Sequence, residues 1–226
     1  MSFTKVIASH LCELCVLCGE KFKLMDDTIR QHKALIRETM RALRDALDSD
    51  ERAAKSLLIK STLFLIPEIM SASSLMFYVS FRSEVQTEPM IKQALSLGKQ
   101  VIVPITDMKN KRLLLSQIKD LDEDLVPGTW GIREPKPGKI RPVAYSDIDV
   151  VVTPGLAFSE EGWRIGYGGG FYDRLLRESR KKAYALSFEM QMLPEIPFIA
   201  GQDVPVNYII TEKRAINCEK NKVAHF

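Results

Sequence analysis

The twelve residues from 162 to 173 carry the side chains whose types and spacing most clearly predict chemistry. They read Gly-Trp-Arg-Ile-Gly-Tyr-Gly-Gly-Gly-Phe-Tyr-Asp and hold five of the twelve glycines of the chain. A glycine-rich turn lets backbone N–H groups approach a phosphate without a clash from Cβ atoms. Arg164 can add a forked cationic contact, and Asp173 can hold a magnesium ion beside the phosphates. The alternative is a tight loop whose glycines serve only for turning. We favour the phosphate site because so many glycines lower stability.

The segments around this motif predict a strand, a turn and a helix. Residues 149–153 are apolar and β-branched and end at Pro154, which is typical of a buried strand. Phe171 opens a helical pattern that continues through Ser179. The glycine turn therefore lies between a strand end and a helix start, where α/β sheets bind ligands.

Strands and helices alternate along most of the chain, which favours a mostly parallel α/β sheet covered on both faces. The stretch 127–142 is rich in Pro and Gly and is expected to be a loop. Residues 78–84 and 188–191 also follow predicted strand ends. Expected strands cover 75–80, 100–104, 112–116, 183–188 and 208–211, and expected helices cover 49–65 and 88–97.

The first expected helix begins near Asp26 and Asp27, whose carboxylates suit a helix start. Its spacing places two groups of residues on separate faces. The apolar group is Ile29, Ile36, Met40, Leu43 and Leu47, and the basic group is Lys33, Arg37, Arg41 and Arg44. By itself the basic stripe is expected to be a solvated face of an amphipathic helix.

Length and composition are those of an ordinary globular enzyme. The chain has 226 residues, 46% of them hydrophobic and 27% charged, and a net charge of +3. This charge is too small to indicate nucleic acid as a partner, and no apolar run reaches the ~18 residues of a membrane span.

Residues 1–24 differ from the rest and contain Cys12, Cys15 and Cys18, whereas the fourth cysteine is Cys218. A metal or iron–sulfur site is one interpretation; three small apolar residues are the favoured one, because no fourth cysteine lies nearby. We expect 1–24 to be a loosely attached appendage or Met25 to be the physiological start, followed by one domain over 25–226. Free thiols and the absence of a convincing secretory signal predict that the protein is located in the reducing cytoplasm.

Residues 162–173 also resemble the signature G-x-R-[I/L]-G-x-G-x-G-[F/Y]-Y-D of 5-formyltetrahydrofolate cyclo-ligases, also called 5,10-methenyltetrahydrofolate synthetases. Four further segments are similar to motifs of this family. They are the K-x-x-x-R of Lys33 and Arg37, the S-x-x-x-E-[V/I]-x-T of residues 80–87, the aromatic-G-I-x-E-P of residues 130–135, and the acidic position of Asp203. Gln86 and Asn207 stand where relatives commonly have acidic residues.

The resemblance implies a three-layer α/β/α fold of the kind shared with sugar-phosphate isomerases and CoA transferases, with helices at its amino terminus. It implies an enzyme that uses ATP and magnesium to convert 5-formyltetrahydrofolate into 5,10-methenyltetrahydrofolate, with release of ADP and phosphate. The expected partners are this small-molecule substrate alone, with no nucleic acid or membrane, and the chain is expected to be a monomer.

The same resemblance implies roles for individual residues, which fall into four groups. Arg164, Lys33 and Arg37 are the expected catalytic cations. The expected ATP site adds Gly166, Tyr167, Gly168, Gly169, Gly170, Phe171 and Tyr172. The expected folate site comprises Glu84, Val79, Trp130, Tyr167 and Phe171, and the expected magnesium ligands are Asp173 and Asp203.

Two alternatives from other functional classes stay open. A non-catalytic relative could keep the pocket and bind a nucleotide or RNA, although Arg164 and Asp173 are both retained and no basic, aromatic-rich patch is present. An isomerase or transferase on the same fold is the other alternative, because a fold does not determine a function.

Overall fold

A computed structural model describes residues 26–221, which form a central sheet of seven strands in the order β11-β10-β9-β6-β1-β2-β3. The predictions for residues 1–24, including those for Cys12, Cys15 and Cys18, lie outside the described residues. Within the described part of the chain, no helix is long and apolar enough to cross a membrane.

The sheet is mostly parallel, as the sequence predicts, with an antiparallel strand at each edge. Five strands run parallel to one another, β3 pairs antiparallel with β2, and β11 pairs antiparallel with β10. The strands are β1 (Ser74–Met76), β2 (Gln100–Asp107), β3 (Arg112–Ile118), β6 (Val150–Thr153), β9 (Lys182–Leu186), β10 (Tyr208–Ile210) and β11 (Ala215–Asn217).

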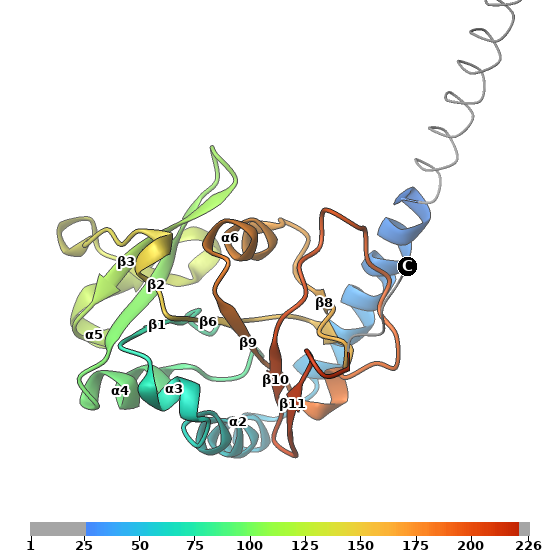
Figure 1. The fold of residues 1–226 in the computed structure, drawn as a ribbon, viewed down its shortest axis with the longest axis horizontal. Helices are drawn as coiled ribbons and strands as arrows, with labels where there is room; N and C mark the ends of the chain where they lie inside the picture. The colour runs from blue at the N-terminus through green and yellow to red at the C-terminus, as the bar shows by residue number, and fades with distance from the viewer. Residues whose placement is uncertain (1–25, 222–226) are drawn as a thin grey trace, which may run out of the picture.

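Helices cover both faces of the sheet, so the molecule has three layers (Figure 1). Figure 1 shows α2, α3 and α4 on one side of the sheet and α6 on the other. These helices are α2 (Ser49–Leu63), α3 (Pro67–Ser71), α4 (Glu88–Ser96) and α6 (Phe171–Ser179), with a short α5 (Leu121–Asp124) and a first helix over 26–45.

Alternation along the strands builds a separate apolar core on each face. Leu75, Val150 and Val152 point into the cluster shared with α2, α3 and α4, whereas Met76 and Val151 point into the cluster shared with α6. The two cores hold the carboxyl ends of the parallel strands in one row, and the loops that follow them meet there.

The first helix packs along the side of the molecule where β8 (Arg164–Ile165) lies (Figure 1). Met40 packs there with Leu156, Ala157 and Ile165 in a third apolar cluster. Leu43, which the sequence places on the same face as Met40, is 43% exposed.

The resemblance leaves the solvated-face prediction only for Arg41 and Arg44, and it is wrong for Arg44, which is 3% exposed. Lys33, for which the resemblance implies contact with ATP phosphates, is also buried, at 5% exposed. Positions 33, 37, 40 and 44 follow one helical face, and Met40 on that face turns the two cations toward the protein.

Several connections are more ordered than predicted. In the segment expected to be a loop over 127–142, β5 (Arg133–Pro135) pairs antiparallel with β4 (Leu125–Pro127) to form a hairpin. A second hairpin joins β7 (Ala157–Phe158) to β8 ahead of the glycine turn. Short 3-10 turns are η1 (Thr129–Gly131), η2 (Pro137–Lys139), η3 (Tyr145–Asp147) and η4 (Glu189–Gln191).

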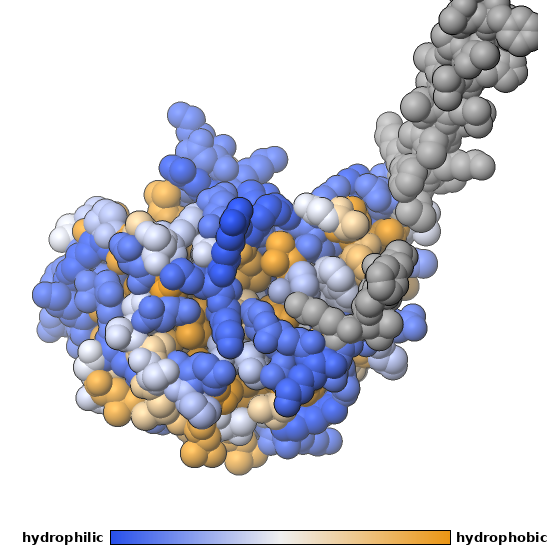
Figure 2. All heavy atoms as spheres, in the orientation of Figure 1, coloured by the Kyte–Doolittle hydropathy of each residue, from blue (hydrophilic) through white to orange (hydrophobic). Residues whose placement is uncertain are grey.

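The surface drawn in Figure 2 is mainly hydrophilic, with apolar side chains gathered along the lower edge where α2 and α3 lie. The exposed apolar residues of this region are Leu57, Leu58, Leu65 and Met70.

Candidate active site

The glycine turn forms an open N-terminus for α6. Gly168 has a φ of +99° and Gly170, the N-cap residue, has a φ of +65°, a backbone region that side chains with a Cβ rarely adopt. A Cβ on Gly169 would lie 2.6 Å from the ring of Phe171. No side chain among the residues that the structure describes caps this helix start, so its first N–H groups are available to an anion.

Two cations of the first helix reach this turn and the acid next to it. Arg37 donates from Nε to the carbonyl oxygen of Gly166 at 2.8 Å. Lys33 forms a short ion pair with Asp203, whose Oδ2 also accepts from the N–H of Ile199 at 2.6 Å. Burial lowers the pKa of Arg37, and Asp203 and Asp173 oppose that shift, so both carboxylates lie within electrostatic reach of this guanidinium.

Arg164 and Asp173, the two charged ends of the motif, lie in contact. Nη2 of Arg164 donates to Oδ1 of Asp173 at 3.0 Å, and the same oxygen accepts from the N–H of Val204 at 3.2 Å. Arg164 is 5% exposed. Within residues 26–221 its buried Nε has no hydrogen-bond partner, which leaves one donor for a ligand.

The carboxylates of this region suit a hard cation that takes most of its ligands from phosphate oxygens and water. Oδ2 of Asp173 and Oδ1 of Asp203 accept no hydrogen bond from the described residues, so each carboxylate keeps one oxygen available. No group of three or more His, Cys, Asp or Glu side chains gathers within residues 26–221. Mg²⁺ is usually bound by one or two carboxylates together with phosphate oxygens and waters, rather than by protein ligands alone. The two carboxylates here match that pattern.

A second group of side chains surrounds Glu84, which is 7% exposed rather than an exposed loop acid. Tyr167 donates its hydroxyl to Oε1 of Glu84 at 2.5 Å, and the N–H of Phe81 donates to Oε2 at 2.9 Å. Burial raises the pKa of Glu84, and the hydroxyl of Tyr167 and the charge of Arg44 partly offset this.

Aromatic rings lie beside the glycine turn and form the outer part of the site. Trp130, 59% exposed, meets Phe171 edge to face, with ring centroids 6.3 Å apart. Arg164 lies over the ring of Tyr172 at 5.8 Å. Val79, which was predicted to contact the folate, is buried at 3% exposed in the apolar cluster against which Tyr172 packs. A flat ligand can stack on exposed rings of this kind.

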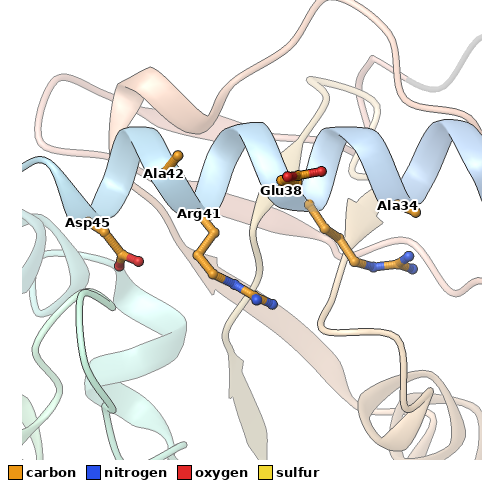
Figure 3. Close-up of a pocket in the computed structure, with 6 residues that line it drawn as sticks. Ala34, Glu38, Arg41, Ala42 and Asp45 are labelled. Atoms are coloured by element: carbon orange, nitrogen blue, oxygen red, sulfur yellow. The ribbon is translucent and has the colours of Figure 1, made fainter.

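A groove of about 550 Å³ runs along the first helix and shares Arg37 with the cations described above. Figure 3 shows Arg41 and Asp45 extending from the same side of this helix. Arg41 is exposed, as the sequence predicts. The other lining residues are Ala34, Glu38 and Ala42.

Sequence reasoning missed two buried residues that organise these loops. Arg44 donates to Ser83 and Tyr167, and its position on the face of Met40 was the available signal. Gln191, which carried no assigned role, is 1% exposed and donates to the carbonyl oxygens of Gly155 and Leu156. No local pattern distinguishes such an amide from a surface glutamine, because its partners lie far away in the sequence.

The predicted residues thus meet in five pairs, four of which join separate segments: Arg37 with Gly166, Lys33 with Asp203, Tyr167 with Glu84, and Trp130 with Phe171. The fifth pair, Arg164 with Asp173, lies within the glycine motif. Cations, open N–H groups and available carboxylate oxygens suit a nucleotide phosphate, while the Glu84 side suits a ring with N–H donors.

Comparison with known proteins gives a consistent result. Residues 29–212 match the model of the 5-formyltetrahydrofolate cyclo-ligase family. The chain is 28% identical to the 5-formyltetrahydrofolate cyclo-ligase of Mus musculus, over 82% of this chain and 96% of that protein. It is 31% identical to the mitochondrial 5-formyltetrahydrofolate cyclo-ligase of Arabidopsis thaliana, over 82% of this chain and 76% of that protein.

Among solved structures, the NMR structure of the 5,10-methenyltetrahydrofolate synthetase of Aquifex aeolicus has a TM-score of 0.74 against this chain. The two share 27% sequence identity over 86% of this chain and 96% of that one.

Proposed function

Because this chain belongs to the 5-formyltetrahydrofolate cyclo-ligase family, we propose that it catalyses the ATP- and magnesium-dependent closure of 5-formyltetrahydrofolate to 5,10-methenyltetrahydrofolate, releasing ADP and phosphate. The observation that carries the proposal is that a site suited to phosphates lies next to the buried carboxylate of Glu84. The two are connected by the glycine turn, because the hydroxyl of Tyr167 in this turn donates to Glu84.

The nucleotide part of the site uses backbone donors and fixed cations. The N–H groups at the start of α6 face the phosphates, and Lys33, Arg37 and Arg164 neutralise their charge. Arg37 holds the turn through the carbonyl oxygen of Gly166, so the donors are positioned before the nucleotide arrives.

Asp173 and Asp203 would hold the magnesium ion through the oxygens that accept no hydrogen bond from residues 26–221. The ion, when bound, neutralises charge on the phosphate oxygens during transfer. Arg164 and Lys33 keep the two carboxylates oriented from the opposite side.

The folate part of the site orients the reacting groups. Each oxygen of Glu84 has one donor from the protein and retains acceptor capacity for N–H groups on the edge of the pterin ring. Trp130 and Phe171 provide aromatic surface beside it.

Ring closure needs activation because the oxygen of an N-formyl group is a poor leaving group. The terminal phosphoryl group of ATP is transferred to the formyl oxygen and ADP leaves. N10 of the folate then attacks the activated carbon, loses its proton to solvent, and phosphate leaves with the former formyl oxygen. Positioning and charge neutralisation are the main requirements for phosphoryl transfer, which fits a site of cations and backbone donors without a covalent nucleophile.

The monomeric state, the absence of nucleic-acid and membrane partners, and a cytoplasmic location are part of the same proposal. They suit an enzyme whose partners are small molecules, and gel filtration and fractionation of cells that express the protein test them.

The direct experiment mixes the purified full chain with ATP, magnesium and 5-formyltetrahydrofolate and follows the absorbance of the conjugated methenyl product. We expect one ADP and one phosphate per product and no product without ATP or with the metal chelated. A Lys33→Met/Arg37→Met double variant is the control for a contaminating enzyme. Nucleotide binding without product would favour the non-catalytic alternative, and RNA binding would be tested with the same preparation.

A further inference from the structure

Arg44 is a buried cation that contacts three loops at the carboxyl ends of strands. Its Nε donates to Oγ of Ser83 at 3.0 Å, its Nη1 to the carbonyl oxygen of Gly155 at 3.4 Å, and its Nη2 to the hydroxyl of Tyr167 at 2.8 Å. These partners follow β1, follow β6, and belong to the glycine turn. One side chain of the first helix therefore joins the loop of Glu84 to the loop proposed to bind phosphates.

We propose that Arg44 is a positioning residue that orients the hydroxyl of Tyr167 toward Glu84 and thereby sets the geometry and charge of the carboxylate that receives the folate. This inference rests on the proposed function, because it assigns the substrate to Glu84. It adds a residue that touches neither ligand and acts through another side chain.

Hydrogen-bond chemistry gives this chain of contacts a single direction. A guanidinium has donors and no acceptor, so the hydroxyl oxygen of Tyr167 must accept from Arg44. The phenolic proton is then directed to Oε1 of Glu84, while the N–H of Phe81 holds Oε2. The carboxylate is thus oriented at both oxygens before a substrate binds.

The three-way contact also explains why the position needs arginine. A buried cation is tolerated when its donors are paired, and only a guanidinium offers donors at Nε and both terminal nitrogens to three acceptors at once. Lysine can supply the charge from the same position but has no planar fork with which to hold three loops. Charge and geometry are therefore separable by substitution.

The charge of Arg44 matters because Glu84 is buried. Burial raises the pKa of Glu84, and the Tyr167 hydroxyl, Arg44 and the Phe81 N–H each lower it. The other titratable groups facing Glu84 are Tyr78 and Tyr172, whose pKa values burial raises, so they remain neutral phenols. Arg44 is a positive charge that lowers the pKa of Glu84, and its loss should raise this pKa further.

The test compares Arg44→Met, Arg44→Lys and Tyr167→Phe with wild type and with Arg30→Met. Arg30 lies on the same helix, is exposed, and among the described residues forms its ion pair with Asp27, so this control removes one cation from the helix without touching the site. Kinetics are measured separately for 5-formyltetrahydrofolate and ATP across pH, and thermal unfolding shows which variants remain folded.

For Arg44→Met we expect kcat/KM for the folate to fall on the order of tenfold to a hundredfold, with a smaller change in the KM for ATP because Arg37 still holds the turn. The acid limb of the pH profile should move to higher pH by about one unit or more. Arg44→Lys should restore the acid limb but not kcat/KM. The Arg44→Met/Tyr167→Phe double variant should lose less than the product of the two single losses, because both break the same contact.

Equal losses for folate and ATP, an acid limb that does not move, or independent effects of Arg44 and Tyr167 would each overturn the inference. Tyr167→Phe removes only a hydroxyl on a half-exposed ring, so it keeps the test decisive if Arg44→Met does not fold.

Failure of the proposed function has a different signature, namely a wild-type chain that forms no product. Titration of the Glu84 carboxyl by ¹³C NMR then decides the inference without turnover. A pKa that rises in Arg44→Met and Tyr167→Phe but not in Arg30→Met would support it, and an unchanged pKa would refute it.

Discussion

At the scale of single residues, the site depends on charged groups whose oxygens or nitrogens are only partly used by the protein. Asp173 commits Oδ1 to Arg164 and to a backbone N–H, while Oδ2 stays available. Glu84 commits one hydrogen bond at each oxygen. Internal partners orient such groups, and the remaining hydrogen-bonding capacity is what the proposed ligands would use, so conservative substitutions can separate the two roles.

Asp173→Asn keeps an oxygen acceptor for Arg164 and Val204 but removes the negative charge that would attract magnesium. We expect a folded variant whose kcat falls on the order of a hundredfold and whose rate needs more magnesium. Titrating turnover with magnesium measures both effects. Asp147→Asn, at an exposed position, should behave as wild type. An unchanged magnesium dependence would remove Asp173 from the metal site.

Glu84→Gln keeps the shape of the side chain but places an amide where a carboxylate accepts two donors. We expect the KM for 5-formyltetrahydrofolate to rise on the order of tenfold, because a hydrogen bond to a charged acceptor is stronger than one to a neutral acceptor. The KM for ATP should change little. Steady-state kinetics in both substrates test this, and an unchanged folate KM would limit Glu84 to a structural role.

At the scale of elements, the candidate site is formed by one turn and one helix that lie more than a hundred residues apart in the sequence. The glycine turn exposes the start of α6, and the first helix supplies Lys33, Arg37 and Arg44. The turn conformation is possible because of glycines at positive φ. The helix is held by Met40 in its own apolar cluster, so the cations keep their place without a ligand.

Gly168→Ala tests whether the turn conformation matters for the nucleotide. With a φ of +99° at this residue, a Cβ should cost about 1–3 kcal/mol or reshape the turn. We expect the KM for ATP to rise more than the KM for the folate. Gly138→Ala is the matched control, because nothing lies within 4 Å of the added Cβ and its φ is not positive. Equal behaviour of the two variants would contradict the role of the turn.

At the scale of the whole molecule, the sheet and its two cores keep the strand ends in register, and buried ion pairs fasten the surrounding segments. Asp124 at the end of α5 is 2% exposed and accepts from Arg141 at 2.7 Å and from the N–H of Lys119 at 2.8 Å. The hydrogen bond from Arg141 is the main reason that the pKa of Asp124 lies well below its ordinary value. A carboxylate of this kind adds stability above its unfolded-state pKa.

Asp124→Asn should therefore lower the melting temperature at neutral pH by roughly 2–6 °C. The stabilisation is present above about pH 4 and is lost as pH falls toward the depressed pKa of the folded state, so the difference between variant and wild type should shrink in strong acid. Melting curves from pH 7 to pH 2 measure this. Asp122→Asn, an exposed position paired with Lys92, should change little at any pH. A constant difference across pH would mean that the ionisation of Asp124 is not its cause.

Features that depend on neighbours along the chain could be predicted from the amino-acid sequence alone. The glycine turn, the start of α6, the alternation of strands and helices and the mostly parallel sheet all follow from local composition and periodicity, and the structure confirms them. The phosphate and folate residues could be proposed because each lies in a short motif. The hairpin of β4 and β5 was missed because Pro and Gly dominate the local signal there.

Which side chains contact one another follows instead from the packing of distant segments in three dimensions. Arg44 is three residues from the exposed Arg41, yet its partners lie 39 to 123 residues away along the chain. Whether such a cation is solvated or buried depends on how the helix rotates against distant loops. That rotation follows from the packing of Met40 into its cluster, a contact that periodicity within one helix does not specify.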